Sequence, residues 1–358
     1  MLTIKYRIYP TRKQQDILWK QSNLLNRLYN NFLEQKIKAY KEKGITLKRF
    51  ELQSQLPKIK EDNPEYKEIH SQVLQQVPKR LDTTYKAFFK RGYGFPNFRS
   101  SKFFFGLVYP QNTGCRVDGK KLLVGKEKIK MIQHRPIPSN IQTRTITRTT
   151  DNKWFLCLSY ENQKQPEINN KTVLGIDLGL TNIVYCSDGH SIKNKNHTKY
   201  YDKQIAKLQT KQSKCIKGSR QYKQYQKVMN RLYGQKVRKT KDFLHKVSNT
   251  LVHKDFDVIG LEKLETKEMT EGYKHSLNKS IRNSQLGLLI NFLKYKTENI
   301  GKKVVFVNPK DTSKKCSVCG KKHDMKLWDR EMVCSCGNRM DRDYNASLNI
   351  MKLARASL

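Results

Sequence analysis

Val173-Leu-Gly-Ile-Asp-Leu-Gly179 is a short apolar run that carries one acid near its end. A second run, Val258-Ile-Gly-Leu-Glu262, also ends at an acid. Short apolar runs with these flanks are typical of buried strands, so both acids are expected at strand ends. A third acid lies in Asp341-Arg-Asp-Tyr-Asn345 and opens a predicted amphipathic helix. Folding could bring these three acids together: Asp177, Glu262 and Asp343.

The order of the predicted elements around these acids favours a ribonuclease H-like α/β fold. Two or three antiparallel strands begin at the first acid, with a turn at Asp188-Gly189. The elements that follow are a long helical stretch, a strand at 257–261, a helix around 286–295, a strand at 304–307 and a closing helix at 345–353. Antiparallel strands followed by alternating helices and strands is the order of that fold.

The N-terminal half has a different pattern. Residues 11–95 have helical periodicity, begin with a capping box from Thr11 to Gln14, and stop near Gly92. The β-rich runs that follow predict a small antiparallel barrel or sandwich: 102–109, 115–124, 129–134, 141–149 and 154–160. Residues 2–9 also predict a strand, so we interpret the helical block as an insertion into this β module. A polar linker at 161–171 leads to the acid-bearing region.

Three acids in this fold order point to metal chemistry. A lone aspartate between glycines is weak support, because such carboxylates often cap turns. A buried acid at the end of an apolar strand, however, is costly unless it is paired or metal-bound. Two Mg²⁺ ions about 4 Å apart, bridged by the three carboxylates, would activate water and stabilise the leaving oxygen of a phosphodiester. Glu265 and Asp341 are interpreted as solvated bystanders, although Asp341 is close enough to the third acid to assist.

Four cysteines between the second and third acids have the spacing of a zinc site. Cys316-Ser-Val-Cys319 forms one pair, and Cys334-Ser-Cys336 forms another after fourteen residues. Four thiolates can complete a closed tetrahedral site, which is structural because no position remains for a substrate water. The tighter second pair leaves His323 as a substitute ligand, should Cys334 or Cys336 fail to reach. The alternative is four free or disulfide-bonded cysteines, which the glycine after each pair makes a poorer explanation.

The charge of the chain predicts a polyanionic partner. Among 358 residues, 72 Lys and Arg face 31 Asp and Glu, which gives a formal net charge of +41. This excess is far beyond what solubility needs and favours nucleic acid. No stretch approaches the roughly 18 consecutive apolar residues of a spanning helix, so no membrane partner is expected. The length suggests two or three domains.

A basic stretch with few acids predicts where a phosphate backbone could bind. Between His197 and Lys241 there are fourteen Lys or Arg and one acid, Asp202. The spacing i, i+4 places four lysines on one helical face, and stacked like charges destabilise an isolated helix. These lysines, called the basic rail below, are Lys199, Lys203, Lys207 and Lys211. A solvated face would normally include glutamates, whereas tyrosines are interleaved here, so we interpret the rail as a backbone contact.

The β module contains two further basic candidates. Arg144 and Arg148 share one face of a predicted strand and are predicted to contact nucleic acid. We expect Phe103-Phe-Phe105, Trp154 and Phe155 to belong to the core.

The motifs around the acids and cysteines resemble the TnpB family. They are Gly-Ile-Asp-Leu-Gly at 175–179, Gly-Leu-Glu-Lys-Leu at 260–264, Thr312-Ser313 before the first cysteine pair, and Arg342-Asp-Tyr-Asn-Ala346. The resemblance implies a compact, transposon-encoded, RNA-guided DNA endonuclease, related to type V CRISPR effectors. It also implies that Asp177, Glu262 and Asp343 are the catalytic triad. The zinc ligands that it implies are Cys316, Cys319, Cys334 and Cys336. The second cysteine pair departs from the commoner Cys-x-x-Cys.

The resemblance further implies a domain organisation and a set of partners. The implied domains are a wedge-like β barrel at 1–10 and 97–166, a helical recognition lobe at 11–95, a RuvC-like nuclease domain at 171–312 and 337–358, and a zinc ribbon at 313–336. We expect a monomeric ribonucleoprotein in the prokaryotic cytoplasm, associated with the nucleoid. Its partners would be a guide RNA and double-stranded target DNA, cleaved next to a short adjacent motif with Mg²⁺ at a single RuvC site.

Two other functions are alternatives to this interpretation. A nuclease-inactive, RNA-guided DNA-binding repressor would be favoured by a missing acid, yet all three acids are present. An unguided, structure-specific nuclease with a RuvC-like core, such as a junction resolvase, has little use for a helical lobe, a β module and this much positive charge. RNA bound to the purified protein would discriminate among the three.

Overall fold

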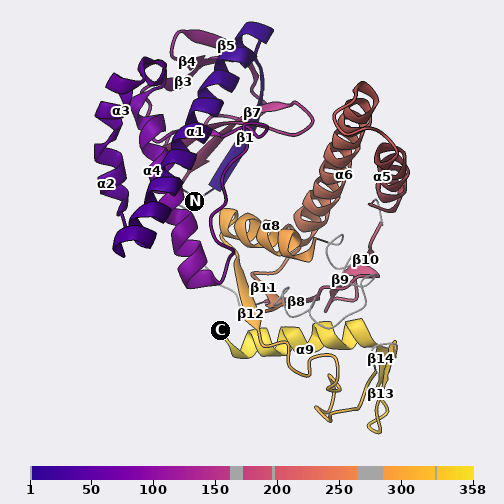
Figure 1. Ribbon diagram of the computed structural model, residues 1–358. Coiled ribbons are helices and arrows are strands. Elements are labelled where there is room, and N and C mark those ends of the chain that lie inside the picture. Colours follow the sequence, from indigo (N-terminus) through magenta and orange to yellow (C-terminus); the bar gives the residue numbers. More distant parts are fainter. Residues whose placement is uncertain (1, 162–171, 196–197, 264–284, 327–328) are drawn as a thin grey trace. The chain divides into compact units, whose positions relative to one another are not determined.

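The computed structural model describes residues 2–161, 172–195, 198–263, 285–326 and 329–358 (Figure 1). The chain divides into two compact units, residues 1–162 and 163–358. Among the described residues, no helix combines the length and the apolar character that crossing a membrane requires. The predicted linker at 161–171 lies outside the described residues, apart from Glu161.

The first unit is built on one antiparallel sheet of seven strands, in the order β2-β6-β7-β1-β5-β4-β3. The strands are β1 Leu2–Tyr9, β2 Leu107–Tyr109, β3 Cys115–Asp118, β4 Lys121–Val124, β5 Glu127–Ile132, β6 Ile141–Arg148 and β7 Trp154–Tyr160. Because all seven strands share one sheet, the barrel alternative fits and the two-sheet sandwich does not. The first strand, β1, lies between β5 and β7.

Helices interrupt this sheet between β1 and β2. They are α1 Arg12–Lys43, α2 Arg49–Ser54, α3 Leu56–Asp62, the short 3-10 helix η1 Pro64–Glu68, and α4 Ser71–Arg91. The predicted capping box is present, because the Thr11 and Gln14 side chains each accept the other's backbone N–H. Helix α4 continues through Pro78 and ends at Gly92, whose φ of 63° is left-handed.

The aromatic run at 103–105 only partly joins the core of this unit. Phe105 is buried, whereas Phe103 is 62% exposed, so the core prediction for Phe103 is wrong. The predicted strand 102–109 is formed only from Leu107 onward. Its first half instead bonds to α1, because Asn26 donates to Phe103 O (3.0 Å) and Ser22 Oγ accepts from Phe105 N (2.6 Å).

The second unit contains a five-stranded sheet in the order β10-β9-β8-β11-β12. Its strands are β8 Val173–Asp177, β9 Asn182–Cys186, β10 Ser191–Lys193, β11 Val258–Glu262 and β12 Lys303–Val307. The pairs β8–β9 and β9–β10 are antiparallel, whereas β11 is parallel to both β8 and β12. The strands follow one another along the chain as predicted, beginning with three antiparallel strands, and Gly189 lies in the predicted turn at a φ of 83°.

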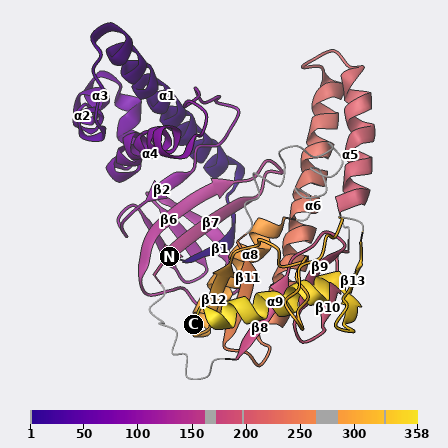
Figure 2. The ribbon, with the colours of Figure 1, turned by 90° about the horizontal axis from the view of Figure 1, so that it is seen from below.

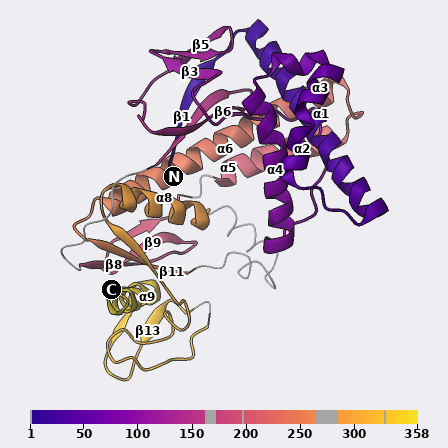
Figure 3. The same cartoon turned by 90° about the vertical axis from the view of Figure 1, so that its left-hand side faces the viewer.

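Helices cover both faces of this sheet (Figure 3). They are α6 Arg220–Val252 and α8 Leu286–Asn299 on one face and α9 Arg342–Ala356 on the other, whereas α5 Thr198–Ser213 packs against α6. On one face, Leu174 and Ile176 join a core with residues of α6 and α8. On the other face, Val173 and Val258 join a core with α9, which lies along the sheet in Figure 2. The result is a three-layer α/β/α arrangement.

Helix α9 lies directly on the backbone of β8 and β11. A Cβ atom on Gly175 would come within 2.1 Å of Ser347 O, and one on Gly260 within 2.7 Å of Ala354 Cβ. Glycine is therefore required at both positions for this close approach. The first turn of α9 consequently lies near β8 and β9, where Tyr344 pairs with Tyr185 at a ring-centroid distance of 5.7 Å.

Candidate metal centres

Asp177 and Glu262 lie at equivalent ends of two neighbouring parallel strands. Ile176 pairs with Leu261 in the register of β8 and β11, and the two acids are the next residues. Side chains alternate between the faces of a sheet, so each acid lies on the same face as the glycine two residues before it. This is the face that α9 covers, and Asp343 lies in the first turn of α9. The three predicted acids thus meet at one edge of the sheet.

Burial raises the pKa of all three carboxyl groups, and neighbouring acids raise it further at Asp177 and Asp343. Burial raises the pKa of Asp177 well above its ordinary value, and the charges of Glu262 and Asp343 raise it further. Burial also raises the pKa of Glu262. The pKa of Asp343 is raised by burial and then by Asp341, although Arg330 and Arg342 oppose this rise. A divalent cation would compensate such a concentration of negative charge. Among the described residues, however, only the four cysteines discussed below have ligand atoms that all lie within 4.8 Å of one another.

Hydrogen bonds restrain two of the acids. The buried Thr312 hydroxyl donates to Glu262 Oε1. Asp341 Oδ1 caps α9 by accepting from Asp343 N at 2.8 Å and from Tyr344 N at 3.2 Å. Asp341, predicted as a bystander, therefore shapes the turn that carries the third acid. The other predicted bystander, Glu265, lies outside the described residues.

Tyr185 is a neighbour of the acids that the sequence analysis did not identify. It is the cross-strand partner of Asp177, so both side chains lie on the same face of the sheet. Burial raises the pKa of the Tyr185 hydroxyl, and Asp341, Tyr344 and Asp343 raise it further. A tyrosine in a strand beside an acid is common, and only the register of β8 and β9 shows this contact.

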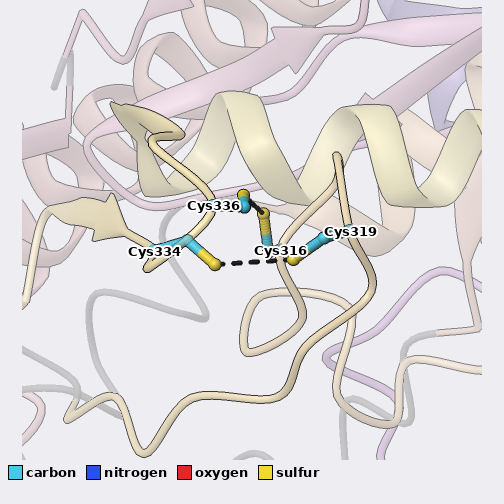
Figure 4. Close-up of side chains that lie close together, drawn as sticks. All are labelled: Cys316, Cys319, Cys334 and Cys336. Carbon is cyan, nitrogen blue, oxygen red and sulfur yellow. Dashed lines mark hydrogen bonds between the residues drawn. The ribbon is translucent and has the colours of Figure 1, made fainter.

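The four predicted cysteines converge from two loops (Figure 4). Their sulfur atoms all lie within 4.8 Å of one another. The Cys316–Cys336 and Cys319–Cys334 sulfur pairs are 3.7 and 3.5 Å apart. Tetrahedral zinc with bonds of about 2.3 Å would place its sulfur ligands roughly 3.8 Å apart. The cluster therefore fits a structural zinc ion, and the shorter second pair reaches it.

Polar neighbours lower the pKa of Cys316 and Cys334, whereas at Cys336 the hydrogen bond from Asn338 N is outweighed by the neighbouring cysteines and burial, which raise its pKa to about 12. Burial raises the pKa of Cys316, but hydrogen bonds from Cys319 N, the Asn338 side chain and Val318 N outweigh it and lower the pKa to about 6. His323, the predicted substitute ligand, lies with Nε2 3.2 Å from Cys334 Sγ. Because all four sulfur atoms converge, His323 is not needed as a fourth zinc ligand. It contacts one of the four cysteines, Cys334.

The basic rail lies on the exposed side of α5, where Lys199, Lys203, Lys207 and Lys211 are all exposed. Helix α5 and the N-terminal part of α6 lie side by side in Figures 1 and 2. The half-buried ion pair of Asp202 and Lys236, 2.7 Å apart, joins the two helices. A groove of about 690 Å³ between them is lined by residues that include Tyr200, Lys207, Lys211 and Leu232.

The two arginines of the β module differ from the rail. Arg144 is only 7% exposed and lies on the same face of β6 as the fully buried Ile146. Arg148 lies over the rings of Trp19 and Trp154, at 4.6 and 5.7 Å from their centroids. The burial of Arg144 argues against its predicted contact with nucleic acid, because the shared face of these arginines is turned toward the core. Trp154 is buried, as predicted.

Three family models match successive parts of the chain. Residues 1–44 match a helix-turn-helix domain, 155–272 a probable transposase, and 287–350 a Cas12f1-like TNB domain. The first of these regions folds as β1 followed by a single helix of 32 residues, so the match there is one of sequence and not of helix-turn-helix geometry.

A solved structure and two relatives resemble the whole chain or much of it. The Cas12f1 chain in a Cas12f1–sgRNA–target DNA complex has a TM-score of 0.60 and 14% identity, over 95% of this chain and 83% of that one, which is a likeness of fold. A Streptomyces pristinaespiralis protein named "Putative RNA-guided DNA endonuclease" is 28% identical, over 99% of this chain and 89% of the relative. A TnpB-like protein of Methanocaldococcus jannaschii is 30% identical, over 51% of this chain and 69% of the relative. The chain belongs to the TnpB family.

Proposed function

We propose that this protein is an RNA-guided DNA endonuclease of a transposon, which hydrolyses both strands of a target beside a short adjacent motif. The observation that carries the proposal is the convergence of Asp177, Glu262 and Asp343 at one sheet edge. The printed name of the Streptomyces relative supports the activity. The Cas12f1 complex with its sgRNA and target DNA supports the partners, a guide RNA and double-stranded DNA.

The proposed nuclease domain is ribonuclease H-like, of the RuvC type. Its support is the strand order β10-β9-β8-β11-β12, with three antiparallel strands leading into parallel ones. We assign 171–312 and 337–358 to this domain and 313–336 to an inserted zinc ribbon. In the N-terminal half of the chain, 1–10 and 97–166 would form a wedge-like barrel, and 11–95 a recognition lobe.

The three acids would hold two Mg²⁺ ions through their carboxylate oxygens, the hard ligands that this cation prefers. The bound ions would supply an activated water and a stabilised leaving oxygen for in-line displacement at phosphorus. The protein's own part is to hold these oxygens in place and limit access of bulk water. Burial of Asp177, the Thr312 bond to Glu262 and the Asp341 cap all serve this purpose.

Base pairing with the guide would select the target sequence, while the protein would bind backbones and the adjacent motif. The net charge of +41 supports a ribonucleoprotein in which the chain neutralises many phosphates, and we expect it to be monomeric. The basic rail is our proposed contact with one of these backbones.

The proposal is tested by expressing the gene with its flanking DNA, purifying the protein, and sequencing any bound RNA. The RNA-loaded protein is then given a matching target in Mg²⁺. We expect double-strand cleavage by wild type and by the control Asp16→Ala, whose side chain is 70% exposed on α1. Asp177→Ala should keep the RNA and lose cleavage. Cutting by Asp177→Ala at the wild-type rate would refute the assignment of the acids. Target binding without cutting by wild type would indicate a repressor, and cutting without RNA an unguided nuclease.

A further inference from the structure

The segment Thr312–Ser317, called the strap below, touches both candidate metal centres. At its start, the Thr312 hydroxyl bonds to Glu262 Oε1 and also lies 3.0 Å from Pro309 O, so two acceptors restrain it. Near its end the strap contains Cys316, one of the four clustered cysteines. The strap thus runs from the second acid to the proposed zinc ion.

Asn345 fastens the other end of the strap to α9. This side chain is fully buried and lies two residues after Asp343. Its Nδ2 donates to Lys315 O, and its Oδ1 accepts from Ser317 N, both at 2.7 Å. The amide therefore hydrogen-bonds to the backbone on both sides of Cys316, once as a donor and once as an acceptor. An ionised Asp cannot donate and Ala can do neither, so neither residue would reproduce both bonds.

Two more side chains of α9 bond to the strap. Asn349 Nδ2 donates to Thr312 O and Lys315 O, each at 2.8 Å. Lys352 Nζ donates to Ser317 O. Positions 345, 349 and 352 lie on one face of the helix, so α9 presents a row of polar donors to the strap. Where α9 approaches β8 and β11, in contrast, it needs no polar donors but requires glycine in the strands, at Gly175 and Gly260.

We propose that the strap fixes the distance between Glu262 and Asp343, and that Thr312 and Asn345 are positioning residues for the divalent-ion site. The inference rests on the proposed function, because it takes the acids as the ligands of those ions. Glu262 belongs to a strand and Asp343 to a helix far along the chain. A connection between them that does not pass through the sheet would keep both oxygens in place when substrate enters. Ligands held by such outer contacts bind metal more tightly than free ones.

The strap also links the two metal centres. Zinc at the cysteines would hold Cys316 and thereby the backbone groups of Lys315 and Ser317 that Asn345 bonds. Binding at the cysteines would then favour binding at the acids, and the coupling would hold in both directions. Bound zinc would therefore do more than stabilise its own loop.

The experiment is a titration of the full-length, zinc-loaded protein with Mn²⁺ in the absence of target DNA, followed by calorimetry and by the Mn²⁺ electron spin resonance signal. Thr312→Val removes the hydroxyl at nearly constant volume and should weaken binding about 10- to 100-fold, as other outer contacts of metal ligands do. Thr312→Ser restores the hydroxyl and should bind within about threefold of wild type. Zinc content should be unchanged in both variants.

Asn345→Ala tests the other end of the strap and should weaken Mn²⁺ binding to a similar degree. Because loss of a buried amide can prevent folding, Asn349→Ala is a milder second variant at a partly exposed position of the same row. Lys315→Gln is the matched control, since it changes an exposed side chain and keeps the carbonyl that Asn345 and Asn349 bond.

Asp177→Ala separates failure of this inference from failure of the proposed function. If Asp177→Ala binds Mn²⁺ as wild type does, the acids are not the ion site and the proposed function fails. If Asp177→Ala loses Mn²⁺ while Thr312→Val and Asn349→Ala bind within about twofold of wild type, the acids are the site and the strap proposal is overturned. Equal loss in Thr312→Val and Thr312→Ser would also overturn it, because the hydroxyl would then be irrelevant.

Discussion

The carboxyl group of Asp177 links the stability of the protein to pH and to divalent ions. Its folded-state pKa lies above the ordinary value of 3.8, because of burial and of two neighbouring acids. The folded state therefore binds this proton more tightly than the unfolded chain does. The resulting stability is fully present below pH 3.8 and is lost as the pH rises through the folded-state pKa. At a pH above its folded-state pKa, Asp177 of the metal-free protein is a buried charge that Glu262 and Asp343 repel.

Asp177→Asn should consequently raise the melting temperature of the metal-free protein at a pH above the folded-state pKa of Asp177, where the wild type carries this buried charge. Mg²⁺ should raise the melting temperature of wild type and leave that of Asp177→Asn nearly unchanged. Asp188→Asn is a control of opposite sign. Burial raises the pKa of Asp188, but hydrogen bonds from Lys254 and from His190 N, together with the charges of these two residues, outweigh burial and lower the pKa, so this variant should melt earlier. Scanning calorimetry with and without Mg²⁺ measures the melting temperatures of the wild type and of the two variants. A lower melting temperature for metal-free Asp177→Asn would contradict the prediction.

At the scale of elements, the contact between α9 and the sheet sets the geometry of the acid site. Gly175→Ala would drive a methyl group against Ser347 O and Met351 N, which are backbone atoms and cannot rotate away. We expect a loss of stability of about 1–3 kcal/mol or more, together with loss of metal binding, because α9 must move away from β8. Gly287→Ala is the matched control, since nothing lies within 4 Å of its Cβ position at the start of α8. This change should stabilise the protein by about 0.4–1 kcal/mol. Urea denaturation compares the two, and equal effects would show that the contact is loose.

The zinc loops are the second element whose stability can be tested separately. Cys316→Ser should lower the zinc content and the melting temperature together, because the binding energy of a structural metal is folding energy. Cys215→Ser changes a thiol outside the cluster and should retain full zinc content. Metal analysis by mass spectrometry and a thermal melt are sufficient. A wild-type protein without zinc would refute the assignment.

The sequence could predict where helices and strands lie along the chain, but not in every case which of their side chains point to the core. The apolar runs at 173–177 and 258–262 are local patterns, and the cysteine spacing is a local signal, so both lead to the structures observed. The orientation of a side chain depends on register and packing, which a run of residues does not contain. Arg144 is buried because it lies on the same face of β6 as Ile146, and this face is turned toward the core. The contact of Asn345 with Lys315 joins residues 30 positions apart, and only the fold shows it.

At the scale of the whole molecule, the excess of positive charge makes nucleic-acid binding depend on salt. Each phosphate contact releases counterions, so the logarithm of the affinity falls linearly with the logarithm of salt concentration. A net charge of +41 predicts a steep slope wherever the contacts lie. The slope alone therefore cannot identify the basic rail. A comparison of two variants that have the same net charge can show whether the basic rail contacts the nucleic acid.

Changing Lys199, Lys203, Lys207 and Lys211 together to glutamine should reduce the slope by about 3, if all four contact phosphates of a single strand. The matched variant changes four exposed lysines that already pair with acids: Lys20, Lys38, Lys86 and Lys246. Exposed ion pairs contribute little to stability, so both proteins should fold. The charge of each paired lysine is already compensated by a neighbouring Glu or Asp. Replacing these lysines should therefore change the slope far less than replacing the basic rail. Fluorescence anisotropy with a poly(U) oligonucleotide at several salt concentrations measures the slopes. Equal reductions in the two variants would mean that the rail acts only as bulk charge, and a larger reduction in the first would locate a backbone contact on α5.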